Sequence, residues 1–196
     1  MISLANLKTA ILSIAVLCMF TATYSCKSEP KQEDPKEVAE DQNKPQDDAT
    51  KEKDEQFLMD AAEINYEEIQ LSQLALQKGT SADVKTLAQM MVDEHTKALS
   101  DLTALAGRKA IAIPTAPTQK VQDAYNNLNN KSGMDFDKEY CDRMVKGHKD
   151  AIDKFENASN NAMDAEIKSW AAASLPTLRN HLTHAETCEQ KLKDMK

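Results

Sequence analysis

The chain has few of the residues that sheets, phosphate-binding loops and nucleic-acid surfaces require. Only 4 of its 196 residues are glycine and 5% are aromatic, which argues against β-sandwiches, barrels and glycine-rich phosphate loops. No nucleophile elbow and no Cys-x-x-Cys pair occurs. Basic residues are outnumbered, since 24 Lys and Arg face 32 Asp and Glu for a net charge of −8. Such a chain lacks the positive charge expected of a nucleic-acid binder.

Residues 1–25 have the pattern of a bacterial export signal. Lys8 precedes an almost continuous apolar run, Ala10 to Phe20, which is too short to span a bilayer of roughly 30 Å. Thr23-Tyr24-Ser25-Cys26 follows and is similar to a loose lipobox, in which Cys26 would carry a lipid. An ordinary secretory peptide that contains Cys26 is the alternative. We therefore expect a lipid-anchored protein of the cell envelope, on the periplasmic face or the outer-membrane surface.

Residues 27–53 contain nine acidic residues, six lysines and three prolines, and no aliphatic side chain larger than valine. Such a stretch buries too little apolar area to offset its ordering entropy. We expect residues 26–53 to be a disordered tether that holds a folded domain, residues 54–196, away from the membrane.

From Phe57 onward, apolar residues recur at the three- and four-residue spacing of amphipathic helices. The stripes and the capping residues predict helices over residues 57–79, 81–107, 118–128, 133–160 and 164–192. Residues 110–117, with two prolines, form an extended crossover. Two hairpins of long helices joined by one long crossover are typical of the ferritin-like four-helix bundle. We therefore predict an all-α domain of that kind, with a short extra helix in the crossover.

Each of the four long stripes carries one polar residue that could bind a metal. These residues are Glu68, His95, His148 and His181. A carboxylate in an apolar core costs several kcal/mol unless it is paired, protonated or metal-bound, and imidazole suits Zn, Fe and Cu. The sequence thus predicts a transition metal ion in the core. Alternatively, the four residues satisfy one another without metal.

A shared metal site also requires that the four residues lie at the same level along the bundle. Glu68 lies 12 residues before Thr80 and His95 lies 15 after it, an offset of less than one turn at about 1.5 Å per residue. His148 lies 12 residues before Asn160, whereas His181 lies 21 after it. The second pair shares a level only if its connection is long and skewed.

Two cysteines accompany the second pair of candidate ligands. Cys141 lies seven residues before His148, and Cys188 lies seven after His181. If the two histidines share a level, so do the cysteines, and an exported protein meets an oxidising environment. A Cys141–Cys188 disulfide is then possible, and two buried free thiols are the alternative.

Three further residues lie near the candidate ligands. Glu94 could orient a ligand histidine, although such residues are more often solvated. Tyr140 could hydrogen-bond within the core or simply fill it. Gly147 either makes room beside His148 or faces water.

The sequence resembles a known family at four stretches that recur in order. They are Phe57-Leu58-Met59-Asp60-Ala61-Ala62 leading to Glu68, Val84 through Asp93-Glu94-His95, Phe136-Asp137-Lys138-Glu139-Tyr140 through His148, and Leu175 through Asn180-His181. The chain is similar over Phe57 to Leu192 to a bacterial envelope family known only as domain of unknown function 4142. The resemblance implies a ferritin-like fold, export and no established reaction. By the same resemblance, Glu68, His95, His148 and His181 match characteristic positions, as do Glu94 and Tyr140.

The sequence departs from di-iron ferritin-like enzymes, which use Glu-x-x-His pairs on two helices. Val92 stands three residues before His95, and Leu178 stands three before His181. Both bridging-type carboxylates are missing, so a single metal held by histidines and Glu68 is easier to build, and an enzymatic role is disfavoured. We expect a membrane-tethered metal-binding domain in metal handling or envelope stress. A non-catalytic structural or interaction lipoprotein is the alternative, and no protein partner can be named.

The lipidation hypothesis predicts the outcome of metabolic labelling. Labelled palmitate should enter the wild-type protein and should not enter Cys26→Ala, because the thiol of Cys26 is the acceptor. Equal labelling of both proteins would contradict a lipid anchor at this residue.

Overall fold

The computed structural model describes residues 33–44 and 49–195, and within these residues it has six helices and no strand. The helices are α1 (Pro35–Asn43), α2 (Ala49–Lys78), α3 (Ala82–Lys109), α4 (Gln119–Asn129), α5 (Gly133–Asn161) and α6 (Ala165–Asp194). The predicted all-α class is confirmed. No helix in the described part of the chain is long and apolar enough to cross a bilayer. The export signal and Cys26 lie outside the described residues.

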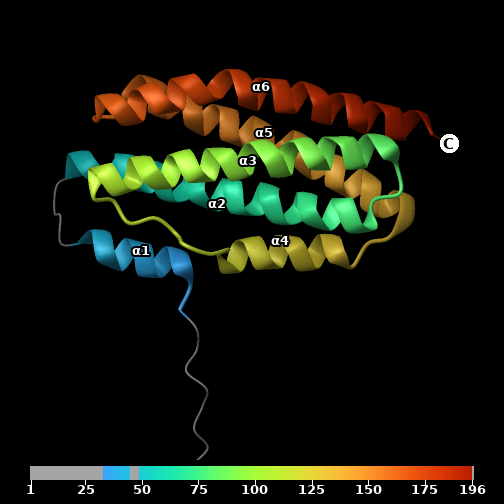
Figure 1. Cartoon of the computed structure of the whole chain (residues 1–196), viewed down its shortest axis with the longest axis horizontal. Helices are drawn as coiled ribbons and strands as arrows, with labels where there is room; N and C mark the ends of the chain where they lie inside the picture. The colour runs from blue at the N-terminus through green and yellow to red at the C-terminus, as the bar shows by residue number, and fades with distance from the viewer. Residues whose placement is uncertain (1–32, 45–48, 196) are drawn as a thin grey trace, which may run out of the picture. The chain divides into compact units, whose positions relative to one another are not determined.

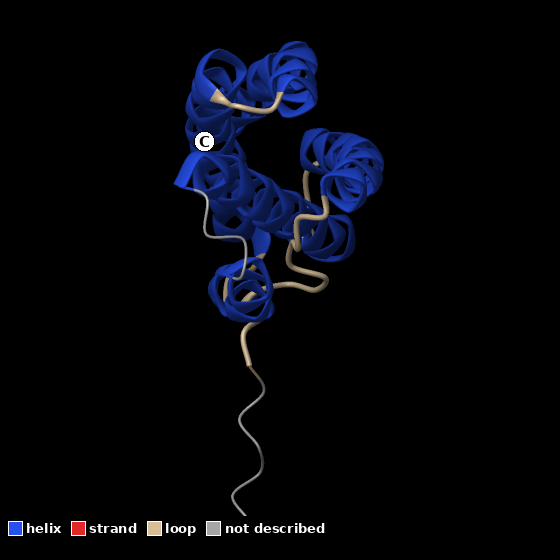
Figure 2. Cartoon of the chain, turned by 90° about the vertical axis from the view of Figure 1, so that its left-hand side faces the viewer, coloured by secondary structure: helices blue, strands red, loops and turns tan. Residues whose placement is uncertain are grey.

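The four long helices lie side by side as two pairs (Figures 1 and 2). Helix α2 packs along α3, and α5 packs along α6. The pairs meet where α2 contacts α5 and where α3 contacts α6. Helices α1 and α4 both pack against α2, and Figure 1 shows them following each other along its outer side.

Capping side chains explain why the predicted helix starts agree with the structure. Ser81, Thr118 and Asp164 each accept a hydrogen bond from a backbone N–H in the first turn of the helix that follows. These bonds satisfy donors that have no partner within the helix. Because such caps can be recognised in the sequence, these starts were predicted to within a residue.

The first helix corrects the expectation of a disordered tether over residues 26–53. Pro35–Asn43 is helical, with Asp34 as its N-cap, and α2 already begins at Ala49. The Asn43 amide donates to the carbonyl of Ala112 at 3.0 Å and accepts from its N–H at 2.8 Å. The small apolar area of this segment did not indicate that it is ordered, because polar groups, such as those of Asn43, hold it against the crossover. Residues 45–48 lie outside the described part.

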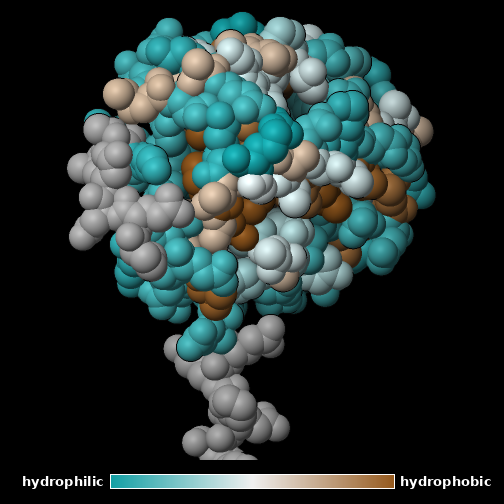
Figure 3. Space-filling view, turned by 60° about the vertical axis from the view of Figure 1, so that its left-hand side comes forward, coloured by the Kyte–Doolittle hydropathy of each residue, from teal (hydrophilic) through white to brown (hydrophobic). Residues whose placement is uncertain are grey.

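The core consists of two apolar clusters with a polar layer between them. One cluster includes Met91 and Met144, and the other includes Leu102 and Ala151. His95 and His148 lie between these positions on α3 and α5, and His181 lies between Leu178 and Ala185, which belong to the two clusters on α6. All three histidines are buried. On the face shown in Figure 3, the surface is mostly hydrophilic and apolar residues show through in recessed patches.

Two buried aspartates tie each helix pair to the turn of the other pair. Asp137 on α5 accepts from Thr80 N–H, from the Thr80 hydroxyl at 2.6 Å and from Ser81 N–H at 2.8 Å. Asp54 on α2 accepts from the N–H groups of residues 163 and 164. The two aspartates are 83 positions apart, and so are the two turns. The turns of the two helix pairs are therefore held by equivalently spaced aspartates.

We expect Asp137→Ala to lower the free energy of unfolding by about 3 kcal/mol, because it leaves several donors at the start of α3 without an acceptor. Urea denaturation of both variants and wild type measures the effect. Asp153→Ala, which removes an exposed carboxylate from the same helix, is the matched control and should change stability by less than about 0.5 kcal/mol. Equal losses in the two variants would contradict the role of Asp137 as a capping residue.

Candidate metal centre

Three imidazole rings meet in the polar layer, one each from α3, α5 and α6. His148 Nε2 lies 3.4 Å from His95 Nε2 and 3.2 Å from His181 Nδ1. One nitrogen of each ring lies within 4.8 Å of the others. All three side chains are at most 3% exposed. His148 and His181 therefore share a level, although their connection is short: α5 ends at Asn161 and α6 begins at Ala165. The long, skewed connection expected from the sequence was wrong, because the turn is centred near residue 163 and not at Asn160.

The outer nitrogen of His95 is held by an asparagine on α2. His95 Nδ1 lies 3.0 Å from Asn65 Oδ1. The amide nitrogen of Asn65 donates to the carbonyl of Ala61 at 2.7 Å, which leaves Oδ1 as the acceptor. His95 therefore carries its proton on Nδ1, and the lone pair of Nε2 points toward the other two rings.

The other two rings follow the same rule. His148 Nδ1 donates to the carbonyl oxygen of Met144 at 2.8 Å, and His181 Nε2 donates to a carboxylate oxygen of Glu94 at 3.0 Å. Each ring thus donates its single N–H to an acceptor outside the cluster. Backbone carbonyls and carboxylates are the partners that metal-bound histidines use to fix their tautomer.

Three lone pairs then converge on one point, where they repel unless a cation lies between them. A tetrahedral metal with metal–nitrogen bonds of about 2.05 Å separates its ligand nitrogens by about 3.3 Å. The two closest pairs here are 3.2 and 3.4 Å apart. The donor set and these two distances fit a transition metal ion.

Burial also keeps these rings in the form that binds metal. It lowers the pKa of His148 to about 4, with the neighbouring His181 adding to the effect. Burial likewise lowers the pKa of His95 and of His181. For His181 the carboxylate of Glu94 opposes the shift. The rings are therefore neutral near pH 7.

Glu68, the fourth predicted ligand, is not part of this cluster. Its Oε1 lies 3.7 Å from Nδ1 of His148, on the side of that ring that faces away from the other two. Its Oε2 has no hydrogen-bond partner among the described residues. Burial, followed by the charge of Glu67, raises the pKa of Glu68 well above its usual value. Glu68 thus neighbours one ligand and does not face the converging lone pairs.

Gly147 provides the space that this carboxyl group occupies. A Cβ at residue 147 would lie 3.0 Å from Oε1 of Glu68, closer than ordinary van der Waals contact. The glycine therefore makes room for Glu68 beside His148, in line with the first of the two interpretations of its sequence position.

Of the two residues expected to orient the ligands, Glu94 contacts a histidine and Tyr140 does not. Glu94 contacts His181 directly, whereas the hydroxyl of Tyr140 bonds to Ser72 at 2.8 Å and reaches no histidine. Asn65 was missed by sequence reasoning. Its place four residues after Ala61 and three before Glu68, on the inward stripe of α2, was a usable signal.

Cys141 and Cys188 also come together as their spacing predicted. Both are buried and free, and a hydrogen bond to Cys188, together with burial, raises the pKa of the Cys141 thiol. The disulfide between them stays a prediction.

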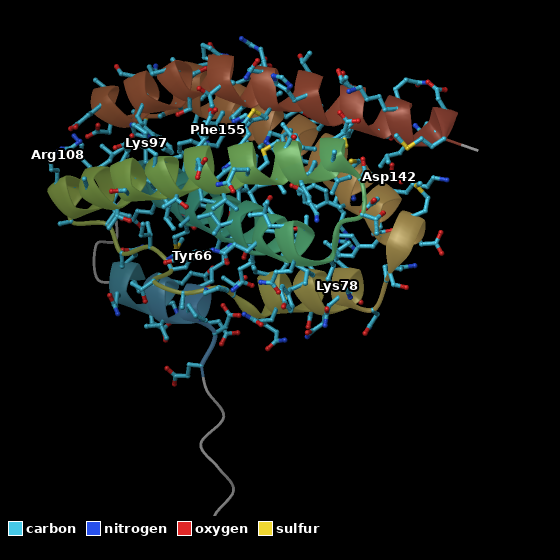
Figure 4. All side chains as sticks on the ribbon, turned by 45° about the vertical axis from the view of Figure 1, so that its right-hand side comes forward. Tyr66, Lys78, Lys97, Arg108, Asp142 and Phe155 are labelled. Atoms are coloured by element: carbon cyan, nitrogen blue, oxygen red, sulfur yellow. The ribbon has the colours of Figure 1, made fainter. Side chains whose placement is uncertain are left out.

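A pocket of about 320 Å³ opens between α3 and α6 and reaches the cluster. His95 and His181 line it, and His148 does not. Figure 4 labels two further lining residues, Lys97 and Phe155, between α3 and the α5–α6 pair. The cluster is thus buried but can be reached from one side.

Comparison with known proteins assigns the chain to a family. The family model described as domain of unknown function (DUF4142) matches residues 39–188. The chain belongs to this family. No curated protein and no solved structure matches this chain. The DUF4142 match begins within α1 and includes all three histidines of the cluster, so the resemblance noted in the sequence is confirmed and extends further toward the N-terminus.

The shifted pKa values predict how the stability of the metal-free DUF4142 domain changes with pH. Unfolded histidine takes up a proton near pH 6.5, whereas folded His148 resists protonation down to about pH 4. The unfolded state therefore binds more protons between these values, and stability falls as the pH falls from 6.5 to 4. His148 alone accounts for about 3 kcal/mol of this loss.

Urea denaturation in EDTA at pH 7, 6, 5 and 4 measures how the free energy of unfolding depends on pH. His148→Gln should flatten the dependence of stability on pH more than His184→Gln, which removes an exposed histidine on α6. The raised pKa of Glu68 acts in the opposite direction, because its contribution is lost as the pH rises through the folded-state value. The same slope of stability against pH in His148→Gln and in wild type would contradict a neutral, buried His148.

Proposed function

We propose that this protein is a membrane-anchored metal-binding protein of the bacterial envelope, with its four long helices forming a ferritin-like bundle. Its core binds one transition metal ion through His95, His148 and His181. The observation that carries the proposal is the convergence of three imidazole lone pairs, each directed inward by an outward hydrogen bond. A cation removes the repulsion among them.

The donor set narrows the choice of metal. Three neutral imidazoles suit Zn²⁺, Cu²⁺ and Fe²⁺ and are poor ligands for Mg²⁺ or Ca²⁺, which prefer oxygen. Di-iron chemistry of the ferritin-like kind needs bridging carboxylates, and Val92 and Leu178 occupy the positions where these would stand. We therefore favour metal handling or an envelope stress response over di-iron oxidation.

The anchor completes the proposal. The lipobox-like sequence at Cys26 and the acidic segment after it support a lipid-anchored protein held near the membrane surface. Lipid attachment would keep the metal-binding domain at the membrane surface of the envelope.

Elemental mass spectrometry of the full-length protein, purified in detergent without a histidine tag, tests the metal site. We expect near-stoichiometric metal in wild type after supply of Zn²⁺, Fe²⁺ or Cu²⁺. His95→Gln and His181→Gln should each weaken zinc affinity by more than about 100-fold, because each removes a ligand. Asn65→Ala should weaken it by about 10- to 100-fold, because it removes only the orienting partner of His95.

Two controls make this test specific. His184→Gln should keep its metal, and so should Glu68→Gln, because Glu68 lies outside the cluster. If wild type binds none of the three metals, the core is a metal-free polar layer in which the rings share protons. The protein would then be the structural or interaction lipoprotein that the sequence left open.

A further inference from the structure

The pocket between α3 and α6 contacts only part of the cluster. Its lining includes His95 and His181 but neither His148 nor Glu68. It therefore approaches the cluster between α3 and α6, with Ile64 and Asn65 of α2 also in its lining. Among the described residues, no fourth His, Cys, Asp or Glu joins the cluster.

A metal held by three protein nitrogens keeps at least one coordination position for another ligand. Zinc sites with three protein ligands are of this open kind, whereas structural zinc sites are closed by four. A position free of protein ligands is useful only if solvent or a small molecule can reach it. The pocket is the route that the structure offers.

The walls of the pocket suit a ligand that has an aromatic ring. Phe155 and Trp170 both line it, with ring centroids 5.4 Å apart, and Phe57 packs edge-on against Phe155 at 5.0 Å. The aromatic cluster thus forms one side of the pocket. A volume of about 320 Å³ is at the lower end of the range for small-molecule sites.

Charge around the pocket favours a neutral occupant. Glu94 and Asp101 line the pocket, and Lys97 is already paired with Asp101 at 2.5 Å. The carboxylate of Glu94 bonds to His181 beside the cluster. These groups disfavour an anionic ligand, so an uncharged nitrogen donor is better accommodated than a carboxylate.

We propose that the remaining coordination position of the metal opens into this pocket and binds a small uncharged molecule that has a nitrogen donor and an aromatic ring. The donor atom binds the metal, and the ring packs against Phe155 and Trp170. This inference rests on the proposed metal site and adds a ligand-binding function to it.

Visible absorption of the full-length protein loaded with Co²⁺ tests the proposal. Cobalt reports the coordination of its site, so a new donor changes its spectrum. We expect both imidazole and 4-phenylimidazole to shift the cobalt bands, with the phenyl compound binding about 10-fold more tightly through the aromatic wall. Trp170→Ala should remove most of that difference and leave imidazole binding within about 3-fold of wild type.

A matched pair of variants tests the route. Ala173 lines the pocket on the exposed side of α6, and the neighbouring Ala172 is equally exposed but does not line it. Ala173→Trp should weaken 4-phenylimidazole by about 10-fold or more, because the indole occupies the same space. Ala172→Trp should leave binding unchanged.

The outcomes separate this inference from the metal site itself. If Co²⁺ gives no ligand-field bands in wild type, and His95→Gln does not alter its binding, the metal site is refuted and the inference fails with it. If the bands are present but neither probe shifts them, the metal site stands and the open position is refuted. Equal binding to Ala173→Trp and Ala172→Trp would show that the probe does not use this pocket.

Discussion

The meeting of three imidazole rings inside the protein is the constraint on which the rest of the structure depends. A buried ring must place one N–H on an acceptor and must find a partner for its lone pair. Here the acceptors are Asn65, the Met144 carbonyl and Glu94, and the lone pairs face one another. Three helices therefore have to keep a common level, and α2 supplies Asn65 beside them. The aspartate caps, which link each helix pair to the turn of the other, help to hold that level.

The aspartates that hold the two turns are equivalently spaced, but the metal-binding residues do not follow this spacing. The shift of 83 residues that relates Asp54 to Asp137 also relates buried positions along the long helices. At the site the paired positions carry different residues: Asn65 with His148, Glu68 with Ala151, His95 with Leu178, and Ala98 with His181. Two ions placed symmetrically would need matching ligands in both halves. One asymmetric cluster suits one ion.

Burial prepares this cluster for metal and also limits how the metal can be reached. Apolar residues lie on both sides of the polar layer, so desolvation keeps the histidines neutral and raises the pKa of Glu68. Neutral imidazole is the form that donates to a metal. The pocket between α3 and α6, lined in part by aromatic rings, gives access to two of the three histidines, His95 and His181.

The sequence by itself determined the helical class, most helix boundaries and which residues face inward, because these follow from local periodicity and capping groups. It also singled out His95, His148 and His181 from the stripes. It missed α1, whose ordering depends on Asn43 bonding to Ala112 across 69 positions of the chain. Only the tertiary structure decided that the three histidines converge, that Asn65 and Glu94 orient two of them, and that Glu68 lies beside the cluster. These outcomes depend on how far each helix is shifted and rotated against its neighbours, and spacing along one helix carries no information about that.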